Sequence, residues 1–132
     1  YAHLPSMQKA LEEIAKAAKN HDVVVGWSLG GRLAAQATVA GLMKPKKLVL
    51  IASAFQFSRS TELPLGIPRD QYEKFRGNYQ RNALRTLDKG WELIVKGDKY
   101  ADHIRTRFKD SDKQAMLEHD WLRWLDDLNG FT

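Results

Sequence analysis

Residues 23–31 read VVVGWSLGG, in which the pattern G-x-S-x-G follows a run of valines. The residues after it, RLAA at 32–35, favour a helix. A serine at a sharp strand-to-helix turn has a strained backbone, and its neighbours two residues away must be small. Gly26 and Gly30 fill those positions. The pattern therefore predicts a nucleophile at Ser28, beside a helix N-terminus that can stabilise an oxyanion.

Glycine and serine are common in loops, so a second interpretation has to be weighed. Ser28 could simply cap the helix that follows a glycine-rich turn. The motif, however, stands between an apolar strand and a helix-forming stretch, which is the context that a nucleophile requires. We therefore favour the nucleophile.

The composition narrows the class of protein. With 132 residues, 43% of them apolar and 28% charged, the chain suits one soluble globular unit with a modest core. It contains no apolar run of about 18 residues that could span a membrane. The absence of cysteine excludes disulfides, thiolate catalysis and cysteine-bound metals, and fits a cytoplasmic location. We expect no metal or cofactor. Because the chain starts at Tyr1 without an initiator Met or signal peptide, we expect a processed or partial sequence.

The first part of the chain predicts alternating helices and strands. Ser6 caps a first helix that stops near Asn20. The elements that follow are a strand over 21–26, a helix over 30–41 broken by Pro45, and a strand over 47–52. This order predicts an α/β fold, with two parallel strands that are covered on both faces.

The second part predicts a loop over 54–69 and then helices. Tyr72, Phe75 and Tyr79 share one helical face. The next helix ends at Gly97 and has these inward residues: Leu84, Leu87, Trp91, Ile94 and Val95. Further predicted features are a cap at Asp98, a cap at Ser111, and a last helix with Leu117, Trp121, Leu125 and Leu128 inward and Gly130 as terminator.

Charge is spread unevenly along this helical part. The formal net charge of the chain is +5, and residues 69–109 hold eleven Lys/Arg against six Asp/Glu, whereas residues 110–132 hold two against six. A basic face of this kind is either ordinary solvated surface or a docking face for an acidic partner. No aromatic–basic motif accompanies the charge, so nucleic acid is not expected as a partner.

Together these residues resemble the α/β-hydrolase superfamily and, within it, the carboxylesterases of biotin synthesis, which act on a pimeloyl-carrier-protein methyl ester. The resemblance rests on residues 26–31, on residues 48–53 with Phe55, and on Gly66-Ile67-Pro68. It implies a partial α/β-hydrolase core over 1–60, made of two parallel strands with flanking helices, followed by an all-helical lid over 61–132.

The resemblance also implies roles for individual residues. Ser28 would form the acyl-enzyme, and Gly26, Gly30 and Gly31 would shape its turn. Trp27 and Leu29 would border the acyl pocket, and the N–H of Leu29 would supply half of the oxyanion hole. Basic lid residues of the family meet an acidic acyl carrier protein; Arg85 and Lys89 are the best-matching positions here, with Arg76 and Arg81 nearby.

The catalytic triad is incomplete in this chain. The family order is Ser, Asp, His, but His3 and His21 precede Ser28. His103 directly follows Asp102, and adjacent helical residues point in different directions. His119 falls in an amphipathic segment. Without a base a serine hydroxyl is a poor nucleophile, so we expect little activity from the chain alone.

Several alternatives stay open at this point. A thioesterase or lactonase would share the same turn. A non-catalytic truncated hydrolase would act instead as a binding or dimerisation module. Because two parallel strands leave unpaired edges, we also expect the chain to form a homo-oligomer.

Overall fold

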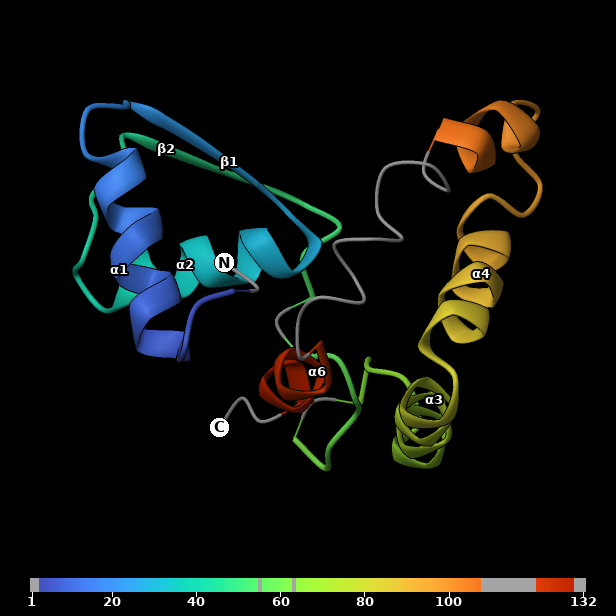
Figure 1. The fold of residues 1–132 in the computed structure, drawn as a ribbon. Helices are drawn as coiled ribbons and strands as arrows, with labels where there is room; N and C mark the ends of the chain where they lie inside the picture. The colour runs from blue at the N-terminus through green and yellow to red at the C-terminus, as the bar shows by residue number, and fades with distance from the viewer. Residues whose placement is uncertain (1–2, 55, 63, 108–120, 130–132) are drawn as a thin grey trace. The chain divides into compact units, whose positions relative to one another are not determined.

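The computed structural model describes residues 3–54, 56–62, 64–107 and 121–129, and Figure 1 shows their fold. The chain forms two compact units. The first comprises residues 1–57 with 127–132, and the second comprises residues 58–126.

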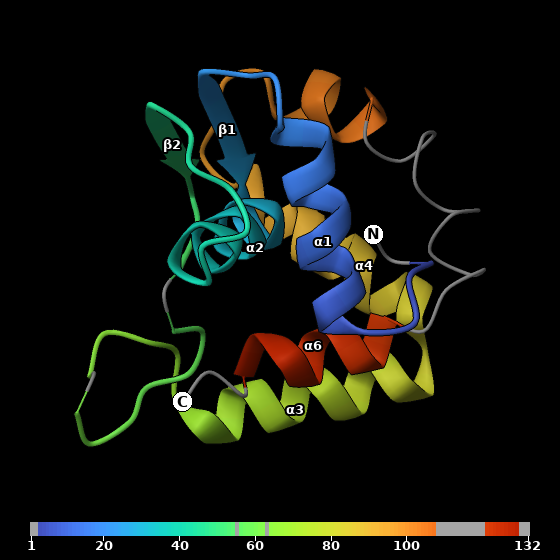
Figure 2. The ribbon, with the colours of Figure 1, turned by 90° about the vertical axis from the view of Figure 1, so that its left-hand side faces the viewer.

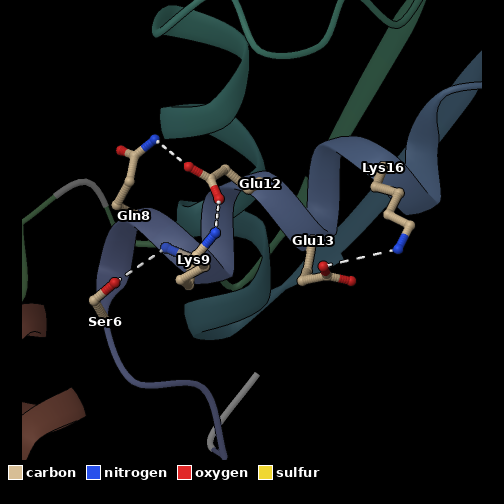
Figure 3. Close-up of polar contacts among 6 residues, drawn as sticks. All are labelled: Ser6, Gln8, Lys9, Glu12, Glu13 and Lys16. Carbon is tan, nitrogen blue, oxygen red and sulfur yellow. Dashed lines mark hydrogen bonds and ion pairs between the residues drawn. The ribbon is translucent and has the colours of Figure 1, made fainter.

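Helix α1 (Met7–Ala18) begins at the predicted cap. The Ser6 hydroxyl oxygen accepts a hydrogen bond from the Lys9 backbone N–H at 3.2 Å, which satisfies one of the free donors of the first turn (Figure 3). On the exposed face of the helix, Lys9 and Glu12 form an ion pair at 2.8 Å. The helix ends at Ala18 with Lys19 as its C-cap, slightly before the expected stop at Asn20.

Strands β1 (Val23–Trp27) and β2 (Lys47–Ile51) pair in parallel, in the register Val23↔Lys47 to Trp27↔Ile51. Helix α2 (Ser28–Val39) connects them. The predicted β-α-β arrangement is therefore confirmed, and the fold is mixed α/β. The helix begins at Ser28 instead of at residue 30.

The end of α2 differs from the expectation. Gly41 has a φ of 72°, and its N–H donates to the Thr38 carbonyl at 3.0 Å, while the N–H of Leu42 donates to the Ala37 carbonyl at 2.9 Å. These two bonds form a Schellman motif, which needs a left-handed residue and so favours glycine. Gly41 thus ends the helix before Pro45 is reached.

The two helices of the first unit lie on the same side of the strands (Figures 1 and 2). Helix α2 packs on both strands and on α1, and its Leu33, Ala34 and Ala37 are buried. On the opposite side, Val23 and Val25 are 51% and 60% exposed. The expectation of strands covered on both faces is wrong for the described residues, because an apolar strand pattern does not say which neighbour covers it.

The second unit is helical after an irregular segment that holds one isolated parallel bridge between Ser58 and Ile67. Helix α3 (Arg69–Arg81) and helix α4 (Ala83–Ile94) pack on each other and are separated by Asn82. The Asn82 side chain caps α4 by accepting from the Arg85 N–H at 3.0 Å.

Most of the predicted inward residues of these helices are at least half-buried. Tyr72 and Tyr79 of α3 are buried, as is Val95, the C-cap of α4. Ile94 is an exception at 67% exposure. It is the last residue of α4.

Among the described residues, this unit also contains helical residues 101–107 and the first part of α6 (Trp121–Asn129), up to Asp126. The Asp98 carboxylate accepts from the Tyr100 N–H at 2.7 Å, as its predicted capping role requires. The predicted features at Ser111, Leu117 and Gly130 lie outside the described residues. Within the described part of the chain, no helix has the length and apolar character needed to cross a membrane.

Candidate active site

Ser28 is the first residue of α2 and directly follows the last residue of β1. Its φ is 51°, in the left-handed region that residues with a Cβ rarely adopt. Trp27 occupies the N-cap position with extended backbone, so Ser28 does not act as the simple cap of the alternative interpretation. Strained, exposed residues of this kind are typical of functional sites.

Strand β1 and helix α2 approach each other closely at Gly26 and Gly31, on either side of this serine in the sequence. A Cβ on Gly26 would overlap the Gly31 Cα, and would lie 2.8 Å from the Gly31 nitrogen. A Cβ on Gly31 would overlap the Ser53 hydroxyl oxygen, and would lie 2.7 Å from the Gly26 carbonyl oxygen. The absence of a side chain at both positions is therefore what allows the turn to close.

Gly30 does not share this role. A Cβ built on it meets no atom within 4 Å among the described residues. Consecutive helical residues point about 100° apart, so Gly31 faces the strand while Gly30 does not. The expectation that Gly30 is needed for steric reasons is wrong in this structure, and Gly31 takes its place as the partner of Gly26.

The residues expected to contact substrate flank Ser28. Trp27 is 54% exposed, and Leu29 is half-buried in the first turn of α2, where backbone N–H groups have no intrahelical acceptor. An apolar cavity of about 420 Å³ lies elsewhere on α2, with Leu50, Ser53 and Ala54 in its wall. Of the described residues, those lining this cavity do not include Trp27, Ser28 or Leu29.

The structure also places three of the four histidines. His21 is exposed before β1, at the end opposite Ser28, so about 15 Å of strand separates the two. His3 is exposed ahead of α1. His103 is exposed in the second unit, and its neighbour Asp102 accepts a hydrogen bond from Arg105 at 3.2 Å. His119 lies outside the described residues.

A second candidate site is a groove between α3 and α4. Its volume is about 500 Å³, and the predicted docking residues Arg81, Arg85 and Lys89 contribute to its wall. The remaining lining residues are Phe75, Asn78, Asn82, Thr86, Gly90 and Leu93. The fold therefore brings three of the four predicted basic residues together, and we call this feature the basic groove.

Arg76, the fourth predicted docking residue, lies elsewhere and has a partner of its own. Its guanidinium donates two hydrogen bonds to the Asp126 carboxylate, at 2.5 and 2.8 Å. The Tyr72 hydroxyl donates to the Leu125 carbonyl at 2.8 Å. These contacts join α3 to α6, which lie side by side in Figure 2, and we call them the α3–α6 clasp.

The electrostatics of the clasp follow from its geometry. Hydrogen bonds from Arg76 hold the pKa of Asp126 below its ordinary value. Burial raises the pKa of Tyr72, and the negative charge of Asp126 adds to the rise. Because Asp126 neutralises Arg76, this arginine contributes less to an anion-attracting surface than the three residues of the basic groove do.

The chain is similar in sequence to two proteins that are named as esterases. The chain is 32% identical over 94 residues to a pimeloyl-[acyl-carrier protein] methyl ester esterase from Nitrosomonas europaea, a match that covers 71% of this chain and 37% of the relative. It is also 32% identical over 79 residues to a protein of the same name from Pectobacterium atrosepticum, covering 60% and 31%. The similarity is to esterases. No family model matches the chain.

These matches bear on the class of reaction. The chain spans about a third of the length of the relatives that it matches. They support a hydrolase of the esterase kind, and both relatives are named for a methyl ester of a pimeloyl-[acyl-carrier protein].

Sequence reasoning missed two residues at these sites. Ser53 contacts the turn from the loop just after β2, and its only sequence signal is a small polar residue after a strand. Asp126 pairs with Arg76, which lies fifty residues earlier in the sequence, and no local sequence pattern predicts such a pair. Both depend on how separate elements pack.

Proposed function

We propose that the protein is a serine carboxylesterase that forms an acyl-enzyme on Ser28. The observation that carries this proposal is the positive φ of Ser28 at the junction of β1 and α2. At this junction the backbones approach so closely at Gly26 and Gly31 that neither position has room for a side chain. The similarity to two named esterases supports the same reaction class. On this proposal residues 1–60 belong to a hydrolase core and residues 61–132 to its lid.

The reaction starts when the Ser28 hydroxyl oxygen attacks the ester carbonyl carbon and its proton passes to a base. The carbonyl electron pair moves to the oxygen, which the free N–H of Leu29 stabilises in the first turn of α2. Collapse of this intermediate expels the alcohol, protonated by the same base, and water then releases the acid. On this proposal, the base is a histidine and its acid partner an aspartate, as the family resemblance implies.

A fluorophosphonate probe tests the nucleophile directly, because it phosphonylates an activated serine and displaces fluoride. In protein that includes the catalytic base, we expect one adduct per chain, mapped to Ser28 by tandem mass spectrometry. Ser28→Ala should abolish the adduct and leave the melting temperature unchanged, while Ser60→Ala is the matched control on another exposed serine. In an active preparation, Ser28→Ala should lower ester turnover by about 10⁶. An adduct that persists in Ser28→Ala would refute the proposal.

The proposed substrate is an acyl ester carried by an acidic acyl carrier protein, as the names of the relatives suggest. The basic groove supports this part, because Arg81, Arg85 and Lys89 line one concave surface. Charges arranged in this way speed the encounter with an acidic partner and are screened by salt.

An association module is the second candidate, and the exposed face of the sheet favours it. Val23, Val25, Trp27 and Ile51 form this face, which we call the outer sheet face, and each of them is about half exposed or more. Contiguous apolar surface of this kind usually marks an interface. Labelling of Ser28 distinguishes the two candidates, because association alone needs no reactive serine.

A further inference from the structure

Ser53 touches both ends of the turn that holds Ser28. Its hydroxyl oxygen lies 3.5 Å from the Gly26 carbonyl oxygen, two residues before Ser28. The same oxygen occupies the space that a Cβ of Gly31 would need, three residues after Ser28. One half-buried hydroxyl, two residues beyond the end of β2, thus contacts the residues on either side of the nucleophile.

The backbone that delivers Ser53 is itself strained. Ala52 has a φ of 47°, and it follows β2 as Ser28, with a φ of 51°, follows β1. Since Trp27 pairs with Ile51, the two strained residues stand at equivalent places at the carboxyl ends of paired strands. Alanine gains nothing from a left-handed conformation, so surrounding contacts must hold it there.

We propose that Ser53 is a positioning residue for Ser28: its hydroxyl, held between the Gly26 carbonyl and Gly31, keeps the turn closed and the nucleophile at positive φ. This inference rests on the proposed function of Ser28. The Ser53 hydroxyl lies within hydrogen-bonding distance of two carbonyl oxygens, that of Gly26 at 3.5 Å and that of Ile51 at 3.1 Å. Ser53 takes no part in the chemistry and touches no reacting atom.

Without the hydroxyl, a small gap opens between β2 and the turn. The strained Ser28 then loses a contact that opposes its relaxation toward negative φ. A nucleophile displaced by a fraction of an ångström reacts much more slowly, because attack needs precise distance and direction.

The test compares Ser53→Ala with Thr38→Val in the full chain. The control, Thr38→Val, also removes one partly buried hydroxyl that donates to a backbone carbonyl, here that of Ala34 at 2.9 Å. Both residues belong to α2, but Thr38 lies near the end of this helix that is far from Ser28. We measure the fluorophosphonate labelling rate constant of Ser28 and the melting temperature. Ser53→Ala should slow labelling about tenfold, whereas Thr38→Val should leave the rate unchanged at a similar melting temperature.

A second measurement does not depend on reactivity. The NMR coupling between the amide and α protons of Ser28 depends on φ, so it should change in Ser53→Ala and stay the same in Thr38→Val. An unchanged coupling in Ser53→Ala, or equal slowing in both variants, would overturn the positioning role. If wild-type Ser28 stays unlabelled in protein that includes the catalytic base, the esterase proposal fails, and the coupling alone decides the role of Ser53.

Discussion

Gly26 and Gly31 leave no room for a side chain where β1 meets α2, whereas Gly30 faces open space. We therefore expect Gly26→Ala and Gly31→Ala to lower the free energy of unfolding by about 1–3 kcal/mol, because backbone atoms would have to move. Gly30→Ala should instead raise it by up to about 1 kcal/mol, since alanine loses less backbone entropy in a helix.

Urea unfolding of the three single variants checks this residue-scale prediction. Gly30→Ala serves as the matched control, since it adds the same methyl group one residue from Gly31. Equal destabilisation by all three substitutions would contradict the assignment of the close contact to Gly26 and Gly31.

Helices α3 and α4 form the basic groove, and its charge should matter only for a carrier-bound substrate. Charge reversal by Arg85→Glu with Lys89→Glu should raise KM for an ester on acyl carrier protein and leave kcat/KM for a small soluble ester unchanged. The reason is that charge complementarity acts on encounter and is screened by salt.

Lys74→Glu is the control for the groove, because Lys74 is exposed on α3 and does not line it. We expect this variant to have a much smaller effect on KM, and added salt to erase the difference between wild type and the groove variant. A loss of the same size for both substrates would argue against docking.

The α3–α6 clasp predicts a pH-dependent stability of the helical unit. The pKa of Asp126 is lower in the folded state than its unfolded value of about 4. The pair therefore stabilises the folded state above that pH, and the contribution is lost as the pH falls through the folded pKa. Both side chains are partly exposed, at 37% and 46%, so we expect at most about 1 kcal/mol.

Chemical unfolding of wild type and Arg76→Gln, measured from pH 7 to pH 2.5, tests the clasp. The difference in stability between the two proteins should be present at pH 7 and shrink toward zero at the acidic end. Arg69→Gln is a matched control, because its ion pair with Glu73 lies within one helix at 64–78% side-chain exposure. A pH-independent difference for Arg76→Gln would rule out the titration of Asp126 as its cause.

At the scale of the whole molecule, the outer sheet face is apolar and exposed, and we propose that a second copy of the chain covers it. Val25→Lys, at the centre of this face, should shift the protein toward monomer in sedimentation velocity runs over a range of concentrations. Val39→Lys is the control, because Val39 is 90% exposed on α2, away from that face. A wild-type protein that stays monomeric at every concentration would contradict the proposal.

Local sequence rules predicted the elements of this protein well. The cap at Ser6, the strands on either side of α2 and the turn at Ser28 each depend on residues within about one helical turn or one strand of each other. Such features need only side-chain periodicity, capping hydrogen bonds and the conformational freedom of glycine. For the same reason the chemistry expected of Ser28 could be inferred before the fold was known.

Only the tertiary structure decided the contacts between distant residues. It left one face of the strands exposed, paired Arg76 with Asp126, and put the Ser53 hydroxyl against Gly31. These contacts join elements whose relative placement depends on packing, and no pattern within a single element encodes that placement. The sequence by itself therefore determined which turn could hold a nucleophile, while the packing of β2 and α2 decided which residues hold that turn in place.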